Sequence, residues 1–323
     1  MGQTLVTGAT GGLGSALLVE AQRRGASLRG TSRSRREAQG VDFVRIEFAD
    51  PHADYAALVE GCDTVIHSAA LSDSWGGAAK FDATNVKATR RLLDAARSAG
   101  VRHFVVVSSP SIFARFEDQT RIGEHHPPNE QPLNHYARTK LAAERDVLGA
   151  GGSDMATCAI RPRAMVGHGD RVILPRLIEI AHRKRIPLPR GGRAMIELTD
   201  IRDAAWAICE AAERCRTING RAINISGGRP LAVGELARRV AEVLGTQPKL
   251  VDLPLGPAHG LAATLEGAAK LLGLKEPPLT RYTLSTLGYS QTFDLEPAKR
   301  LLGYEPRYDA VETILSEARK AAA

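Results

Sequence analysis

Three residues in the middle of the chain have side chains suited to acid–base chemistry. Tyr136 and Lys140 are four residues apart, so on a helix they lie on the same face. A nearby ammonium group favours the phenolate and lowers the tyrosine pKa from its usual value of about 10. Ser109 offers a hydroxyl that can hold a carbonyl oxygen beside that tyrosine. Because a tyrosine and a lysine at this spacing are more often a surface pair, the inference depends on the rest of the chain.

A second stretch with a possible chemical role, here the binding of a phosphate group, occupies positions 3–14, which read QTLVTGATGGLG. Residues 3–7 predict a buried strand, and glycines at positions 8, 11 and 14 lead into an apolar helix. Backbone N–H groups and the positive end of a helix then meet at one point, which suits a pyrophosphate. Gly8 permits the tight turn, Gly11 lets phosphates approach, and Gly14 lets the helix pack against the strand. A glycine-rich turn without a ligand is the alternative.

Strands and helices that alternate along the chain must position these residues. Near-continuous apolar strands separated by helices indicate a parallel sheet with both faces covered, and right-handed crossovers make it doubly wound. Strands are expected at residues 3–7, 27–32, 43–48, 63–67, 104–108, 157–161, 195–199 and 222–226. Helices are expected at residues 83–99, 134–148, 172–183, 204–213, 233–244, 261–272, 295–302 and 311–320. The fold class is therefore α/β, a Rossmann-type sheet with a smaller, mixed and mainly helical C-terminal part.

This pattern also suggests how the chain is divided. Residues 1–165 form the predicted dinucleotide-binding domain, whose core also includes about 194–226. Residues 166–323 are mainly a substrate-binding part that is interleaved with this core. Residues 114–133 are polar and contain three prolines, so they are predicted to be a loop. Together with residues 254–286 they are expected to shape the substrate pocket.

The residues that follow the second strand bear on the choice of cofactor. Ligands of such sheets bind at the carboxyl ends of the strands, and an acid after the second strand would bind a free ribose 2′-hydroxyl. This chain has Arg33 there, with Arg35 and Arg36 close behind. A guanidinium suits a 2′-phosphate, so NADP(H) is favoured, with NAD(H) as the alternative. A solvated surface arginine is the other interpretation of Arg33.

Composition and charge exclude several other classes of protein. The net charge of +7 suggests an anionic partner, but aromatic residues make up only 5% and do not interleave with the basic clusters, so no nucleic-acid partner is expected. The four cysteines are scattered without a C-x-x-C pair, which predicts a reducing compartment and no metal site. No apolar run is long enough to span a membrane, and no signal peptide fits, so a cytoplasmic location is expected.

The order of these motifs resembles the extended short-chain dehydrogenase/reductase superfamily, of the NAD(P)-dependent epimerase/dehydratase type. The glycine turn is followed by HSAA at 67–70, SSPS at 108–111 and YARTK at 136–140. FDATNVKATRRLLDAA, IRPRAMVGHGD and NISGGRPLAVGEL extend the resemblance over most of the chain. HSAALSDSWG, VVVSSPSIF, PLTRYTLSTLGYS and FDLEPAKRLLGYEPRY are similar to the branch of 3β-hydroxysteroid dehydrogenases and 2-alkyl-3-oxoalkanoate reductases. Those enzymes interconvert a ketone and a secondary alcohol on bulky apolar substrates.

The resemblance implies roles for individual residues. Tyr136 would be the acid/base, Lys140 its activator and a ribose ligand, and Ser109 the carbonyl binder, a role that Ser111 could share. The implied cofactor-binding residues are Gly8, Thr10, Gly11, Gly12, Leu13, Gly14, Arg33, Glu47, Ser68, Ala69, Ala70, Asn85, Ser108, Tyr136, Lys140 and Pro162. The candidate substrate residues are Trp75, Ser111 and Arg163. A homodimer through the helices at 83–99 and 134–148 is also implied.

The chain departs from the pattern of the superfamily at two places. Glu47 stands where an aspartate usually contacts adenine. Near residue 202, where an aspartate is expected, the chain has Arg202 followed by Asp203. Arg202 is interpreted as a surface arginine, with an anion-binding residue as the alternative. Neither departure affects the serine, the tyrosine or the lysine.

These observations favour an NADP(H)-dependent oxidoreductase that interconverts a ketone and a secondary alcohol on an apolar substrate such as a β-keto acid or a 3β-hydroxysteroid. One alternative is a nucleotide-sugar epimerase or dehydratase with tightly bound NAD, in which Arg163 and Arg193 would clamp the pyrophosphate. A second alternative is a non-catalytic regulator that senses the cofactor. Relatives of that kind often lack the tyrosine or the lysine, whereas this chain retains both.

Overall fold

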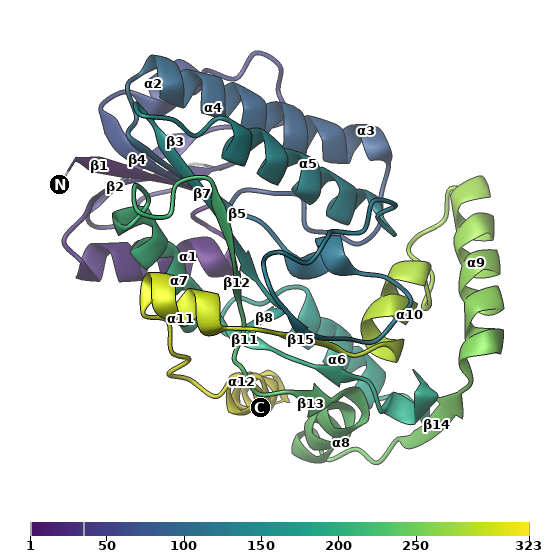
Figure 1. Cartoon of the computed structure of the whole chain (residues 1–323). Helices are drawn as coiled ribbons and strands as arrows, with labels where there is room; N and C mark the ends of the chain where they lie inside the picture. The colour runs from purple at the N-terminus through teal and green to yellow at the C-terminus, as the bar shows by residue number, and fades with distance from the viewer. Residues whose placement is uncertain (1, 35, 323) are drawn as a thin grey trace.

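The computed structural model describes residues 2–34 and 36–322, so Arg35 lies outside the described residues. In the described part of the chain, seven parallel strands form the central sheet, in the order β12-β7-β5-β4-β1-β2-β3 (Figure 1). They are β1 (Gln3–Thr7), β2 (Ser27–Ser32), β3 (Val41–Arg45), β4 (Cys62–His67), β5 (His103–Val107), β7 (Ala156–Pro162) and β12 (Arg221–Ile225). The strand order reverses between β1 and β4, which confirms the predicted doubly wound sheet.

Helices cover both faces of this sheet. α1 (Gly12–Arg23) and α7 (Ile201–Glu213) pack on one face. α2 (Tyr55–Val59), α4 (Ala88–Ser98) and α5 (His135–Gly149) pack on the other. The short helix α3 (Ala78–Phe81) continues into the π-helix η1 (Asp82–Lys87) and then into α4, so the helix begins earlier than the predicted residue 83.

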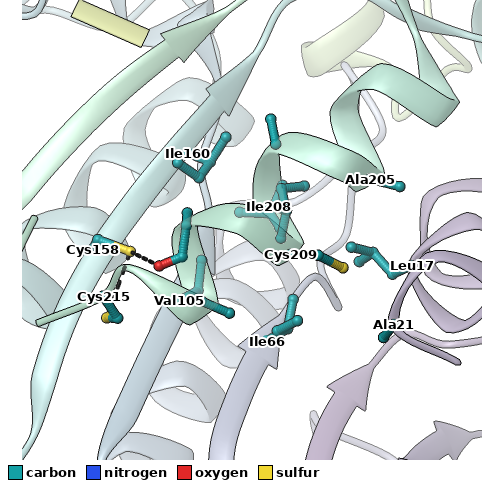
Figure 2. Close-up of a cluster of buried hydrophobic side chains, with 14 of the residues drawn as sticks. Leu17, Ala21, Ile66, Val105, Cys158, Ile160, Ala205, Ile208, Cys209 and Cys215 are labelled. Atoms are coloured by element: carbon teal, nitrogen blue, oxygen red, sulfur yellow. Dashed lines mark hydrogen bonds between the residues drawn. The ribbon is translucent and has the colours of Figure 1, made fainter. Parts of the chain in front are cut away.

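The apolar strands supply two separate cores because successive side chains point to opposite faces of the sheet. In β5, Val105 and Val107 pack against α1 and α7, whereas Phe104 and Val106 pack against α2, α4 and α5. Figure 2 shows the first core, in which Ile208 from α7 lies among strand side chains. All four cysteines lie within the described residues and are buried and free. Burial on both faces explains why these strands lack a polar alternation.

The C-terminal part builds three small sheets, with orders β13-β10-β15-β6, β11-β8 and β14-β9 in the described residues. Their strands are β6 (Gln119–Ile122), β8 (Met165–Val166), β9 (Arg185–Pro189), β10 (Met195–Ile196), β11 (Thr199–Asp200), β13 (Leu231–Ala232), β14 (Lys249–Leu253) and β15 (Gln291–Phe293). The accompanying helices are α6 (Ile173–Ala181), α8 (Val233–Val243), α9 (Leu255–Leu271), α10 (Arg281–Gly288), α11 (Glu296–Leu302) and α12 (Ala310–Ala322). No helix in the described residues has the length and apolar character needed to cross a membrane.

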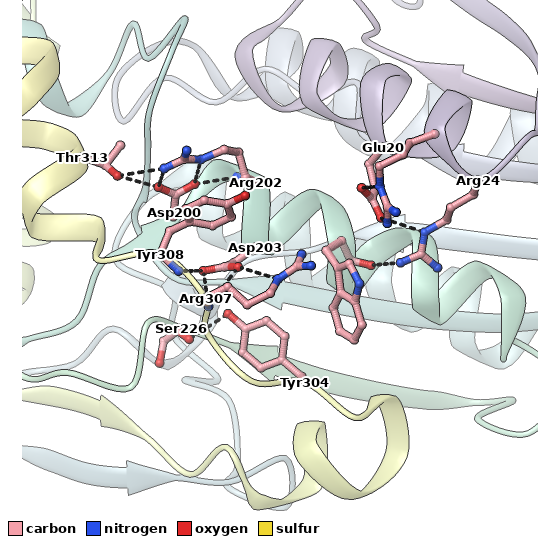
Figure 3. A network of polar contacts seen from close by, with 12 residues as sticks. Glu20, Arg24, Asp200, Arg202, Asp203, Ser226, Tyr304, Arg307, Tyr308 and Thr313 are labelled. Carbon is pink, nitrogen blue, oxygen red and sulfur yellow. Dashed lines mark hydrogen bonds and ion pairs between the residues drawn. The ribbon is translucent and has the colours of Figure 1, made fainter.

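A polar network fastens the C-terminal segment to the start of α7 (Figure 3). The buried carboxylate of Asp203 accepts hydrogen bonds from the backbone N–H groups of Arg307 and Tyr308. Arg202 forms an ion pair with Asp200 at 2.7 Å, and its guanidinium lies 3.5 Å from the centre of the Tyr308 ring. Arg202 therefore has a carboxylate partner within the chain, and both Asp200 and Asp203 are buried in this turn.

Several predicted elements differ from the structure. The third strand is β3 (Val41–Arg45) rather than 43–48, because its register with β2 ends at Arg45. The predicted loop 114–133 contains β6, which pairs with β15 far along the chain. The predicted strand 195–199 is two short strands, β10 and β11, in different small sheets. After residue 248, β14, β15 and α10 were not predicted, and the two strands pair with partners that are distant in sequence.

We expect Leu17→Ala to lower the free energy of unfolding by about 2–5 kcal/mol, because it leaves a cavity between α1 and the sheet. Leu17 is fully buried in that core, whereas Val19 on the same helix is 69% exposed. Val19→Ala is the matched control and should change stability by less than about 0.5 kcal/mol. Urea denaturation followed by circular dichroism measures both variants, and equal losses would contradict the assigned packing.

Candidate active site

The turn between β1 and α1 has the geometry that its glycines predict. Gly8 adopts a positive φ of 66°, which favours glycine. A Cβ atom at Gly14 would overlap the carbonyl of Gly8 and lie 2.7 Å from the Cα of Ala9, so the helix packs directly on the turn. Gly11 is exposed, and an added Cβ there would meet only the Gly8 carbonyl at 3.4 Å. Among the described residues, no side chain caps the N-terminus of α1. Its first N–H groups are therefore free to hold an anion.

Buried hydrogen bonds tie this turn to the neighbouring strands. The hydroxyl of Thr31, at the end of β2, accepts from the Gly8 N–H at 2.9 Å. Thr7 accepts from the Ala69 N–H at 3.0 Å, and Ser68 donates to the Thr7 carbonyl at 2.6 Å. The predicted cofactor residues after β4 therefore lie against those after β1. Sequence reasoning missed Thr31 as a site residue, although its position at a strand end was a signal.

Asn85 also lies near this edge, but its amide is occupied. Its oxygen accepts from the Leu71 N–H at 2.7 Å, and its nitrogen donates to the Leu71 carbonyl and to the hydroxyl of Thr139. Asn85 belongs to the π-helix η1, an element frequent at functional sites. These contacts favour a positioning role for Asn85, since it joins the segment after β4 to α5.

Helix α5 brings Tyr136 and Lys140 to the carboxyl edge of the sheet. Asn134 caps the helix by accepting from the Ala137 N–H at 2.8 Å, which places Tyr136 in the first turn. Lys140 follows one turn later, is only 6% exposed, and donates its ammonium proton to the carbonyl of Val107 at the end of β5. The sheet edge and the helix therefore hold both side chains in one place.

The serines after β5 lie in the same region. The Ser109 hydroxyl accepts from the Ser111 N–H at 3.2 Å, and its side chain lies close enough to the Tyr136 phenol to influence its pKa. The hydroxyls of Ser108 and Ser111 are buried without a hydrogen-bond partner among the described residues. Of the two serines considered for the carbonyl-binding role, Ser109 is thus the one that acts on the pKa of the tyrosine.

The pKa of Tyr136 is raised in this structure, whereas the sequence predicts that it is lowered. Burial raises the pKa of Tyr136 to about 12, although the nearby Ser109 side chain opposes the rise. Burial also lowers the pKa of Lys140 to about 8, and the nearby carboxylate of Glu144 opposes that change. The Lys140 ammonium is directed to the Val107 carbonyl, so the cost of desolvating the phenolate decides the tyrosine pKa.

The other predicted residues are spread along this edge. Thr10 and Arg33 are exposed beside the glycine turn, and Glu47 is exposed after β3. Gly12, Leu13 and Ala70 are partly buried in the same edge. Pro162 is buried at the end of β7.

Trp75 and Arg163 are substrate candidates that lie in different surroundings. The indole N–H of Trp75 donates to the Leu274 carbonyl at 3.2 Å, which joins the segment after β4 to the segment after α9. Arg163 is buried directly after β7. Tyr282, in α10, lies close enough to influence both Tyr136 and Arg163 electrostatically. Sequence reasoning missed Tyr282 because α10 itself was not predicted.

Comparison with known proteins identifies the family. The profile of the NAD dependent epimerase/dehydratase family matches residues 4–226. The chain belongs to this family. A 2-alkyl-3-oxoalkanoate reductase of Stenotrophomonas maltophilia is 33% identical over 317 residues, which cover 95% of this chain and 96% of the relative. A 3 beta-hydroxysteroid dehydrogenase/Delta 5-->4-isomerase of Mycobacterium tuberculosis is 30% identical over 331 residues, covering 97% and 89%.

Solved structures agree with this assignment. MoeE5 in complex with UDP-glucuronic acid and NAD superposes with a TM-score of 0.78 at 25% identity, covering 99% of this chain and 100% of MoeE5. The protein is therefore an NAD(P)-dependent enzyme of the extended short-chain dehydrogenase/reductase type, as the motifs predict. Its relatives include a reductase and a dehydrogenase, and a sugar epimerase shares its fold.

A dinucleotide fits the residues present. The glycine turn leaves no Cβ between a phosphate and the backbone, and no side chain in the described part of the chain caps the first turn of α1. The unpartnered hydroxyl of Ser108 offers a further polar contact at the end of β5.

We expect Gly14→Ala to weaken NAD(P)H binding at least about tenfold, because the new methyl group forces the turn away from α1. Gly267→Ala is the matched control, since nothing lies within 4 Å of the added methyl group in the exposed middle of α9. That control should bind cofactor like the wild type and be slightly more stable. Fluorescence titration measures both, and unchanged binding in Gly14→Ala would contradict the assigned packing.

Proposed function

We propose that this protein is an NADP(H)-dependent oxidoreductase that interconverts a ketone and a secondary alcohol on an apolar substrate. The observation that carries the proposal is the placement of the Ser109 side chain close enough to Tyr136 to act on its phenol, with the buried ammonium of Lys140 one helical turn away. This arrangement lies at the carboxyl edge of the sheet, beside the turn that suits a dinucleotide.

The chain's own residues perform the proton chemistry in this proposal. Burial keeps Tyr136 protonated at neutral pH, so its hydroxyl can donate a proton to the oxygen of a ketone as that oxygen becomes an alcohol. Ser109 hydrogen-bonds the same oxygen and orients the carbonyl. Lys140 keeps a positive charge one helical turn from the tyrosine, which favours the phenolate that forms on reduction and that accepts the proton on oxidation. The bound nicotinamide cofactor supplies or accepts the hydride.

An apolar cluster supports the proposed substrate class. Ala258, Ala262 and Leu284 are fully buried where α9 meets α10, and Phe116, Leu253, Leu255 and Leu279 pack against them. All of these residues except Leu253 belong to the two segments that the sequence predicts to shape the pocket, 114–133 and 254–286. The same helix α10 carries Tyr282, which reaches the surroundings of Tyr136.

A second candidate function is nucleotide-sugar epimerisation with tightly bound NAD. The similarity to MoeE5, whose structure contains UDP-glucuronic acid and NAD, favours it. One observation argues against this function. Residues 31–34, at the end of β2 and directly after it, include no acid that would bind a ribose 2′-hydroxyl. Arg193, one of the arginines considered for a pyrophosphate clamp, is exposed.

We expect Arg33→Ala to weaken NADPH binding by about tenfold or more while changing NADH binding less than about twofold, because only NADPH carries the 2′-phosphate. Arg36→Ala is the matched control, since Arg36 is also exposed but three residues further on. Fluorescence titration of wild type and both variants measures the preference.

Three outcomes would contradict this cofactor assignment. If the wild type binds NADH more tightly than NADPH, the proposed preference for NADPH is wrong. If only Arg36→Ala loses NADPH binding, Arg36 rather than Arg33 binds the 2′-phosphate. NAD already bound in the purified protein would favour the epimerase.

We expect kcat/KM for ketone reduction to be level from about pH 6 and to fall as pH rises through about 8. Burial lowers the pKa of Lys140 to about 8, so its ammonium is present below that pH and lost above it, whereas Tyr136 stays protonated throughout. In Lys140→Arg the guanidinium keeps its proton throughout this pH range. The decrease in kcat/KM near pH 8 should therefore disappear, even if kcat/KM of the variant is lower at every pH. A wild-type rate that keeps rising to about pH 9 would refute the assignment.

A further inference from the structure

Arg163 is a buried cation that forms no direct ion pair within the described residues, although the carboxyl of Glu197 is close enough to act on it electrostatically. Its side chain is 8% exposed, and its Nε has no hydrogen-bond partner among the described residues. No described carboxylate forms an ion pair with it. The nearby carboxyl of Glu197 instead accepts from the Ser226 hydroxyl and the Phe293 N–H. Buried charges are normally paired, so this guanidinium requires an explanation.

A neighbouring arginine shows how the fold treats a buried guanidinium that has a partner in the chain. Arg161, two residues earlier on β7, forms two hydrogen bonds with Glu144, at 2.8 and 2.5 Å. Its guanidinium also lies 5.2 Å from the centre of the Phe113 ring. Arg163, directly after the same strand, has no such carboxylate or ring partner among the described residues.

The backbone of Arg163 is held by long-range contacts. Its N–H donates to the Ile225 carbonyl at 2.8 Å, and its carbonyl accepts from the hydroxyl of Thr199. The next residue, Ala164, has a positive φ of 40°, which is unfavourable for a residue with a Cβ. Strain of this kind persists only where surrounding contacts impose it, and it concentrates at functional sites. The fold thus fixes the direction in which the chain leaves β7.

Tyr282 links Arg163 to the candidate active site. The positive charge of Arg163 acts on the phenol of Tyr282, and Tyr282 in turn acts on the phenol of Tyr136. No hydrogen bond to the Tyr282 hydroxyl is formed within the described residues. The guanidinium of Arg163 and the phenol of Tyr282, neither of which has a hydrogen-bond partner among the described residues, therefore lie within electrostatic range of each other, and Tyr282 lies within such range of Tyr136.

We propose that Arg163, with Tyr282 beside it, binds a carboxylate of the substrate close to the carbonyl that reacts at Tyr136. The inference rests on the proposed function and narrows it to keto acids and the matching hydroxy acids. A guanidinium binds a carboxylate through two parallel hydrogen bonds, which are strong where water is excluded. One unpaired guanidinium balances one carboxylate, whereas the diphosphate of a nucleotide sugar carries two charges.

The first experiment measures binding without requiring turnover. Calorimetry compares decanoate, decanamide and UDP on the protein saturated with NADP⁺, for wild type, Arg163→Met, Arg163→Lys and the control Arg171→Met. Arg171 is exposed and eight residues away. We expect the wild type to bind decanoate at least about tenfold more tightly than decanamide, Arg163→Met to lose this preference, and the control to keep it. Arg163→Lys should retain part of it, because a lysine keeps the charge but loses the paired hydrogen bonds.

The second experiment measures turnover of NADPH with 3-oxodecanoate and with 2-nonanone, which lacks only the carboxyl group. Arg163→Met should raise KM for the keto acid about a hundredfold and change kcat/KM for 2-nonanone less than about threefold. Its melting temperature should equal or exceed that of the wild type, since a buried unpaired charge is removed. This result would show that the variant is folded.

The outcomes separate this inference from the proposed function. A wild type that binds decanamide as tightly as decanoate, or a variant that loses both ketones equally, overturns the carboxylate site. The carboxylate site is also overturned if the wild type binds UDP but not decanoate and Arg163→Met loses UDP binding. That result would assign Arg163 to a nucleotide diphosphate. If the wild type prefers decanoate to decanamide but reduces neither 3-oxodecanoate nor 2-nonanone, the result supports the carboxylate site and refutes the proposed oxidoreductase activity.

Discussion

The hydrogen bonds of His67 hold together the edge of the sheet on which the candidate site is built. Its two ring nitrogens contact the hydroxyls of Thr7 and Thr89, at 2.8 and 2.9 Å. Burial, reinforced by the charge of Lys140, lowers the pKa of this imidazole to about 3, so it stays neutral and one nitrogen donates while the other accepts. A buried polar group without a partner is costly. These contacts therefore fix the spacing of β1, β4 and the helix α4, which contains Thr89.

From this point a continuous set of contacts reaches the proposed acid/base. Thr89 donates to the carbonyl of Asn85, whose amide contacts the backbone after β4 and the hydroxyl of Thr139 in α5. Lys140 is the next residue in that helix. The turn that suits a cofactor and the helix that carries the tyrosine are therefore positioned by one buried network rather than by loops. Catalytic geometry requires this kind of support, since small displacements of reacting groups reduce rates strongly.

The sequence predicts the parts of this arrangement that depend on local pattern. The strands β1 and β2 and the three glycines follow from apolar runs and backbone requirements that need no distant partner. The strand β6 was missed because Gln119–Ile122 is polar and becomes a strand only by pairing with β15, about 170 residues later. Tyr282 and the unpaired state of Arg163 were missed for the same reason, since burial and missing partners are properties of the assembled fold.

The pKa of Tyr136 illustrates where such reasoning from spacing fails. The i, i+4 spacing predicts that Lys140 stabilises the phenolate, but spacing gives neither burial nor competing acceptors. In the folded chain the ammonium donates to the Val107 carbonyl, and burial of the phenol dominates its pKa.

Burial also leaves two cations, Lys140 and Arg163, at one edge of the sheet, with the pKa of each lowered by desolvation. Maintaining positive charge in a poorly solvated place reduces stability, and it creates a strong attraction for anionic groups on cofactor and substrate. The electrostatics of this edge therefore favour ligand binding over the stability of the free protein.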